Sequence, residues 1–188
     1  MKLLGTALAL ALIASASACT PEAPVQSASK MGEGPSEGTV LRRATLLTHD
    51  IEKSIAFYEM IGFEQWYIGK PGTISGEGLP VEGTKAGDPS RMVIMRGNHP
   101  YVAMIGLLQY GETTAAPAEP RVRHGDAIMM LEVEGLAEKF PRLVEAGYRV
   151  HHPLKTTHIT SVTAEWDAYF AMVYDPDGHL VELTERLN

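Results

Sequence analysis

Two segments of the chain carry apolar residues at the spacing of an α-helix, and their positions match at one fixed offset. The first is 51–63, IEKSIAFYEMIGF, and the second is 136–148, LAEKFPRLVEAGY. Each ends in a glycine followed by an aromatic residue, which predicts the end of a helix and the start of a strand. Asp50, rather than His49, is the predicted N-cap of the first helix. Pro141 predicts a kink in the second helix, or a helix that begins only near that residue.

Alternating apolar residues predict one strand before each helix and three strands after it, so the order βαβββ occurs twice. In the first half we expect strands over 41–48, 63–68, 91–96 and 101–110. In the second half we expect them over 127–134, 149–152, 169–174 and 180–185. The predicted fold class is α+β, built from two similar modules, and a plain α+β sandwich is the alternative.

The last predicted hairpin, VYDPDGHLVEL over 173–183, has a turn and a strand of unusual composition. Pro176 and Gly178 supply the backbone angles that a tight turn needs. The strand that follows places Leu180, Glu182 and Thr184 on one face and Val181 and Leu183 on the other. A lone buried carboxylate is costly, so Glu182 is expected to face a cavity or a partner.

The repeat and this hairpin resemble the vicinal oxygen chelate superfamily, which includes glyoxalase I, bleomycin resistance proteins and extradiol dioxygenases. The resemblance covers 39–187 and implies paired βαβββ modules whose two curved half-barrels enclose one pocket. It divides a domain over 39–188 into module 1, about 39–111, and module 2, about 125–188. The segment GETTAAPAEP between them has the composition of a linker.

Enzymes of that family bind Fe, Mn, Zn or Ni through side chains on the first and last strands of each module. The resemblance places the four ligand positions at Arg43, Gly106, Ile128 and Glu182, and only Glu182 can coordinate a metal. We therefore expect no metal cofactor, with a divalent metal held in part by Glu182 as the alternative.

The same positions suggest a binding pocket. Arg43 and Glu182 are expected to point into it, either as an ion pair or with Arg43 awaiting an anionic ligand. Strand alternation adds Thr45, which shares a face with Arg43, and Met130, which shares a face with Ile128. The candidate ligand-binding residues are therefore Arg43, Thr45, Gly106, Ile128, Met130 and Glu182. Glu182 is also the candidate catalytic residue, as a general base.

Two other features are open to alternative interpretations. The glycine-rich segment 69–90 is long for a connection and predicts either a functional lid or a disordered insertion. Three histidines, His151, His152 and His158, could bind a metal, but surface or structurally satisfied histidines are the favoured interpretation, because adjacent strand residues point to opposite faces.

The first 38 residues predict a cellular location rather than part of the fold. Residues 1–18 have a lysine, an apolar stretch and small residues, as in a bacterial secretory signal. Cys19, the only cysteine, follows Ala-Ser-Ala in a segment similar to a lipobox, which predicts lipidation at Cys19; ordinary cleavage after Ala18 is the alternative. The composition of residues 19–38 predicts a disordered tether, and the protein is expected at the bacterial cell envelope, anchored in the membrane and facing the periplasm or the exterior.

Charge and the absence of certain motifs argue against several classes of function. The net charge of -7 and the scattered basic residues argue against nucleic-acid binding. The chain has no P-loop, no GxSxG motif and no CxxC motif. The sequence therefore favours an envelope-tethered protein that binds a small apolar or anionic molecule without a metal. The alternatives are a glyoxalase-like lyase or isomerase, a dioxygenase-type enzyme, or an interaction module that forms a homodimer.

Overall fold

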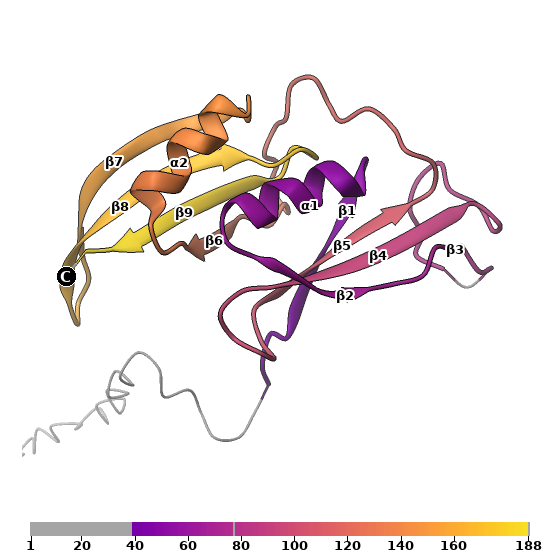
Figure 1. The fold of residues 1–188 in the computed structure, drawn as a ribbon, viewed down its shortest axis with the longest axis horizontal. Helices are drawn as coiled ribbons and strands as arrows, with labels where there is room; N and C mark the ends of the chain where they lie inside the picture. The colour runs from indigo at the N-terminus through magenta and orange to yellow at the C-terminus, as the bar shows by residue number, and fades with distance from the viewer. Residues whose placement is uncertain (1–38, 77, 188) are drawn as a thin grey trace, which may run out of the picture. The chain divides into compact units, whose positions relative to one another are not determined.

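The structure, a computed structural model, describes residues 39–76 and 78–187 and contains a strand-helix-strands unit twice (Figure 1). The predicted signal peptide, Cys19 and the tether lie outside the described residues. No helix within 39–76 and 78–187 is long and apolar enough to cross a membrane. The two sheets, each with its own helix, confirm the predicted α+β class of paired βαβββ modules.

The first unit forms sheet A, in which the strands follow the order β1-β5-β4-β2 and the short β3 pairs with β4. Its elements are β1 (Arg43–Thr48), α1 (Ile51–Met60), β2 (Glu64–Ile68), β3 (Gly72–Thr73), β4 (Pro89–Arg96) and β5 (Met104–Tyr110). Asp50 caps α1 as predicted, because its side chain accepts a hydrogen bond from the backbone N–H of Lys53. The side-chain ammonium of Lys53, whose Nζ lies 3.1 Å from Asp50 Oδ2, is the main cause that lowers the pKa of the Asp50 carboxyl group, and the backbone bond adds to it.

The second unit forms sheet B, with the strand order β6-β9-β8-β7. Its elements are β6 (Met129–Glu132), α2 (Leu136–Glu145), β7 (Val150–Thr160), β8 (Glu165–Tyr174) and β9 (Leu180–Arg186). The expected late start of the second helix was wrong, because α2 begins at Leu136 and contains Pro141. The strand expected over 149–152 was too short. Polar residues such as Lys155 and His158 give β7 no apolar alternation in the sequence. In the structure, pairing with β8 extends the strand to Thr160.

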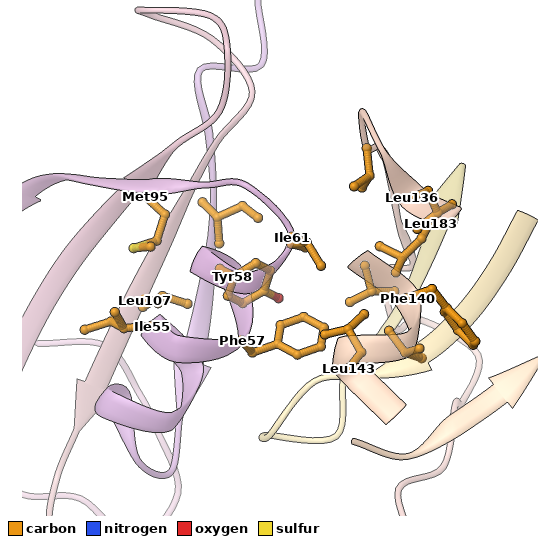
Figure 2. Close-up of a cluster of buried hydrophobic side chains, with 14 of the residues drawn as sticks. Ile55, Phe57, Tyr58, Ile61, Met95, Leu107, Leu136, Phe140, Leu143 and Leu183 are labelled. Atoms are coloured by element: carbon orange, nitrogen blue, oxygen red, sulfur yellow. The ribbon is translucent and has the colours of Figure 1, made fainter. Parts of the chain in front are cut away.

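One shared hydrophobic core joins both helices and one face of each sheet. Figure 2 shows Phe57 and Tyr58 of α1 between Met95 on the side of sheet A and Leu143 of α2. The ring of Phe57, which is fully buried, packs edge-on against Tyr58 and against Tyr148, with centroids 5.0 Å apart in each pair. Burial raises the pKa of the Tyr148 hydroxyl.

The face of each sheet opposite the core carries no helix among the described residues, although Ile94, Met104 and Leu108 are buried on that side of sheet A. Strand pairing identifies these faces, because paired residues point to the same side of a sheet. Outer face A comprises Arg43, Thr45, Leu47, Tyr67, Met92, Ile94, Met104, Gly106 and Leu108. Outer face B comprises Met130, Glu132, His152, Lys155, Phe170, Met172, Glu182 and Thr184. The helix-bearing faces both contribute to the shared core, so the two outer faces are turned away from it.

Candidate functional site

Outer face A presents a single guanidinium group over a glycine. Arg43 is exposed on β1, and its Nε donates a hydrogen bond to Thr45 Oγ1 at 3.0 Å. Its Nη1 lies 3.7 Å from the sulfur of Met92. Thr45 pairs with Gly106 on β5, and a Cβ atom added at Gly106 would lie 3.0 Å from both Arg43 Cδ and Thr45 Oγ1. Arg43 therefore lies across the space that a side chain at position 106 would need.

Outer face B carries an acidic residue between two thioethers. Parallel pairing sets Glu182 beside Met130, and antiparallel pairing sets it beside Met172, which in turn pairs with His152. Glu182 is half-buried, and no side chain in 39–76 or 78–187 forms a hydrogen bond or an ion pair with it. His152 packs edge-on against Phe170, with ring centroids 5.2 Å apart, and its Nδ1 lies 2.8 Å from the carbonyl oxygen of Pro153. A carbonyl can only accept, so Nδ1 carries a proton and Nε2 is left as an acceptor when the ring is neutral.

The structure does not gather the predicted residues into one place. Arg43, Thr45 and Gly106 lie together on outer face A, and Met130 and Glu182 lie together on outer face B. Ile128 comes one residue before β6 and is 48% exposed. The expected contact between Arg43 and Glu182 was wrong for a single chain, because Arg43 contacts Thr45 and Met92 instead. The physical reason is that both sheets bury their inner faces in one core, which turns the two side chains away from each other.

Few donor groups lie at the positions that the resemblance assigns to metal ligands. Of Arg43, Gly106, Ile128 and Glu182, only Glu182 has a side chain that can coordinate a metal, and its paired neighbours in the sheet are Met130 and Met172. Within the described part of the chain, no three His, Cys, Asp or Glu residues form a group that could hold a metal ion. This donor set does not fit the carboxylate and imidazole coordination that Fe, Mn, Zn or Ni takes.

A cavity of about 550 Å³ adjoins outer face B. Met130 and Glu132 of β6 line it together with the turn between β4 and β5, the end of α1 and the start of α2. Met130 is the only one of the six predicted ligand-binding residues that lines it. The cavity wall has both charge signs, since its lining includes Lys139 and Arg186 as well as Glu132, Glu134 and Glu185. Glu185 already accepts hydrogen bonds from the first backbone N–H groups of α2, at Gly135 and Leu136.

A second cavity, of about 360 Å³, lies beside the glycine-rich segment 69–90. Residues 81–84 and Asp88 line it, opposite the end of β1 and Tyr110. The segment also contributes the short strand β3, which pairs with the start of β4. The two interpretations of this segment, a lid and a disordered insertion, both remain predictions.

Two buried aspartates in the β8–β9 turn, Asp175 and Asp177, connect the two units. The sequence pattern predicts only a turn at these positions. Asp177 accepts hydrogen bonds from Ser54 Oγ at 2.6 Å and from the backbone N–H of His49. Asp175 accepts one from the Tyr58 hydroxyl at 3.0 Å and others from backbone N–H groups of its own turn. Burial is the main cause that raises the pKa of Asp175. Burial, with Asp175 close by, also raises the pKa of the Tyr58 hydroxyl well above its ordinary value.

The sequence held a weak signal for these contacts. An Asp-x-Asp turn beside a helix start that offers backbone N–H groups is a common source of buried hydrogen bonds, but the partners are more than 110 residues apart in the chain. The favoured interpretation of His152 from the sequence is a surface or structurally satisfied histidine, and only the strand pairing of β7, β8 and β9 reveals that it shares a face with Glu182.

Comparison with known proteins gives a family match. The sequence profile of the Glyoxalase/Bleomycin resistance protein/Dioxygenase superfamily matches residues 40–183. Among solved structures, the trypanothione-dependent glyoxalase I of Leishmania major is similar in fold, with a TM-score of 0.50 and 16% identity over 79% of this chain and 87% of that one. A glyoxalase family protein from Bacillus cereus has a TM-score of 0.49 and 16% identity over 85% of this chain and 100% of its own. No curated protein sequence gives a significant match.

Proposed function

The chain belongs to the Glyoxalase/Bleomycin resistance protein/Dioxygenase superfamily, and from that premise we propose that it binds a small apolar or anionic molecule on its outer sheet faces, without the family's metal ion. The observation that carries the proposal is the environment of Arg43. Its guanidinium group has no carboxylate partner among the residues described, and it lies on a sheet face with exposed apolar side chains. Leu47 is 41% exposed there and Tyr67 is 49% exposed.

This environment suits a ligand with an apolar body and one negative group. A guanidinium group presents a rigid set of donors that matches a carboxylate, sulfonate or phosphate. Apolar side chains around it gain about 25 cal/mol for each Å² that a ligand covers. Met92, on the same face, is half-buried, and its flexible side chain can adapt to ligands of different shapes.

The proposal can be tested with a fluorescent probe of that chemistry, anilinonaphthalene sulfonate. Saturable binding to the purified protein is expected, with an affinity that falls about tenfold or more in Arg43→Gln, because a charge-assisted hydrogen bond is lost. Arg42→Gln is the matched control, since Arg42 is also exposed but its guanidinium lies over the Tyr101 ring. Equal binding by the wild type and both variants would contradict the role of Arg43.

Metal content gives an independent test. The protein, purified without added chelator, should contain far less than one equivalent of Fe, Mn, Ni or Zn, and its melting temperature should not change when a chelator is added. One equivalent of such a metal, lost in Glu182→Ala, would contradict the metal-free proposal and favour the enzyme alternative.

A second candidate function is an enzyme that uses Glu182 as a general base. The observation that favours it is that Glu182 is half-buried on outer face B between Met130 and Met172, with no ion-pair partner in the part of the chain that the structure describes. A carboxylate that lies beside a bound substrate can take a proton from it as a general base. Turnover of a carbonyl substrate that disappears in Glu182→Gln, while binding of the substrate persists, would support this candidate.

We also propose that the domain is tethered at the bacterial cell envelope through a lipidated Cys19. The support is the position of this single cysteine after a segment with signal-peptide composition. A site held near a membrane would meet small amphipathic molecules that partition there, which agrees with the apolar and anionic ligand class.

A further inference from the structure

The cavity of about 360 Å³ at the end of β1 has no part in the function proposed above. Its wall comes from three segments of the first unit, which are the end of β1, residues 81–88 and residues 110–114. The backbone N–H of Thr114 donates to the carbonyl oxygen of His49 at 3.2 Å and joins the third segment to the first. The volume is toward the lower end of the range for small-molecule pockets, so the cavity suits a small ligand.

The wall of this cavity carries negative charge without a compensating cation. It includes the carboxylates of Glu82, Asp88 and Glu112, and no lysine or arginine of the described chain lines it. None of the three carboxylates forms an ion pair with another described residue. Asp88 accepts one hydrogen bond, at 2.9 Å from the backbone N–H of Lys85, and this bond uses one of its two oxygens. A cleft lined by charge of one sign attracts ligands of the opposite sign, so this cavity favours a cation.

A buried hydroxyl group in the same wall lacks a partner. Thr48, the last residue of β1, lines the cavity and is only 7% exposed. Its Oγ1 is buried and has no hydrogen-bond partner within residues 39–76 and 78–187. A buried hydroxyl without a partner is costly, and a ligand that reaches it removes that cost. The hydroxyl and the charge are independent observations, and both indicate a polar ligand.

His49 adds an oriented hydrogen-bond acceptor. It lines the cavity, and its side chain is 33% exposed. Its Nδ1 lies 3.2 Å from Oδ1 of the buried Asp177. A carboxylate can only accept, so Nδ1 carries the proton and Nε2 of the neutral ring is an acceptor. Tyr110 also lines the cavity, and its hydroxyl already accepts from the backbone N–H of Leu79 at 2.8 Å. The wall therefore offers mainly acceptors to a ligand.

We propose that this cavity binds a small organic ammonium ion, a primary amine with a short aliphatic body. An ammonium group has three N–H donors and no acceptor. The carboxylates, the Thr48 hydroxyl and Nε2 of His49 supply acceptors, and the charge-assisted bonds to the carboxylates are the strong ones. Leu47 and Val81, which also line the cavity, cover the aliphatic part. The site is separate from Arg43 and takes the opposite charge, so it does not depend on the function proposed above.

The distribution of the carboxylates favours an organic cation over a metal ion. Glu82 and Glu112 are exposed, whereas Asp88 is half-buried. Among the residues that the structure describes, no three His, Cys, Asp or Glu side chains form a group that could hold a metal ion. Carboxylates that surround a cavity without converging on one point suit a cation with volume of its own. Because Glu82 and Asp88 belong to the glycine-rich segment 69–90, the proposal gives that segment a binding role.

Isothermal titration calorimetry on the full-length protein, in mild detergent, tests the charge preference. n-Butylamine, which is protonated at neutral pH, should bind with saturation, whereas n-butanol and butyrate, with similar bodies, should not. Asp88→Asn and Glu112→Gln should each weaken binding of the amine about tenfold, because each replaces a charged acceptor with a neutral one of the same shape. Glu119→Gln is the matched control and should bind as the wild type does, since Glu119 is exposed, pairs with Arg121 and lies outside the cavity wall.

Thr48→Val tests the buried hydroxyl, because valine has nearly the same shape as threonine. The variant should bind n-butylamine about fivefold more weakly, and its melting temperature should equal or exceed that of the wild type, since the unsatisfied hydroxyl is gone. Unchanged amine binding in a folded Thr48→Val would overturn the proposal. So would binding of butyrate as tight as that of the amine. Equal losses in Asp88→Asn and Glu119→Gln would also overturn it, because they would assign the binding to the net charge of -7. If Thr48→Val does not fold, Asp88→Asn and Glu112→Gln decide the question.

The two ligands separate this site from the one proposed on outer face A. Arg43→Gln should lose affinity for anilinonaphthalene sulfonate and keep its affinity for n-butylamine. Asp88→Asn should have the reverse behaviour. Amine binding that weakens in Arg43→Gln and not in Asp88→Asn would overturn the separate site, and it would leave the function proposed above to be judged by its own probe.

Discussion

Replacing Asp177 with alanine tests how strongly the β8–β9 turn holds the two units together. The Asp177 side chain is 1% exposed. It accepts hydrogen bonds from the backbone N–H of His49, from His49 Nδ1 at 3.2 Å and from Ser54 Oγ at 2.6 Å. All three donors belong to the start of α1 or the residue before its cap, so Asp177→Ala removes an acceptor that serves the other unit.

The three donors differ in whether another acceptor is available to them once the Asp177 carboxylate is removed. Ser54 Oγ has a second acceptor, the Asp50 carbonyl oxygen at 3.1 Å, and can turn to it. The His49 ring is 33% exposed and can donate to water. The backbone N–H of His49 has no such alternative, and an unsatisfied buried donor costs about 1–3 kcal/mol. With the lost charge-assisted bonds, we expect Asp177→Ala to lower the free energy of unfolding by about 2–4 kcal/mol.

Urea unfolding, followed by far-UV circular dichroism, measures this change. Asp177→Asn should cost only about 1 kcal/mol, because its carbonyl oxygen still accepts from the His49 backbone. Asp126→Ala is the control, since Asp126 accepts from the backbone N–H of Arg123 in an exposed turn, and it should cost no more than about 0.5–1 kcal/mol. Equal costs for the alanine variants at 177 and 126 would refute the argument, and equal costs for Asp177→Ala and Asp177→Asn would assign the effect to charge.

Three further predictions concern other parts of the molecule. Because burial raises the pKa of Asp175, the unfolded state releases this proton more readily, so the contribution of Asp175 to stability should fall as the pH rises above its ordinary pKa of 3.8. Asp175→Asn should therefore become more stable relative to the wild type as the pH rises through and above 3.8, and a difference that does not vary with pH would refute this. Phe57→Ala should lower the free energy of unfolding by about 3–5 kcal/mol in one cooperative transition, since the ring packs against both units; a loss below about 1 kcal/mol would contradict its placement. Cys19→Ser should move the protein from the membrane fraction to the soluble fraction if Cys19 is lipidated, and unchanged fractionation would exclude the anchor.

Much of the fold was predictable, because its signals are local. Each helix is followed by a glycine because the chain needs a positive φ there, which glycine adopts without strain. Gly62 and Gly147 have φ values of 107° and 83°. The alternation around Glu182 predicted which side chains share a face of β9, and the pairing with β8 agrees with it. Such patterns depend on residues within a few positions of each other.

What the sequence could not predict depends on contacts between distant residues. The end of β7 at Thr160 is set by its pairing with β8, and its polar residues give no apolar period. The separation of Arg43 from Glu182 follows from the packing of both helices into one core. Strand alternation correctly placed each side chain on a sheet face, but it contains no information on whether two faces meet.

The relation between Arg43 and Gly106 explains why the metal-binding pattern cannot be restored by one substitution. A carboxylate at position 106 would need a Cβ atom 3.0 Å from Arg43 Cδ, so Arg43 would have to move. Once moved, its guanidinium would pair with the new carboxylate and occupy its oxygens. A metal ligand at 106 therefore requires that Arg43 be replaced as well, for example by histidine. Glycine at 106 and arginine at 43 therefore form one coupled arrangement.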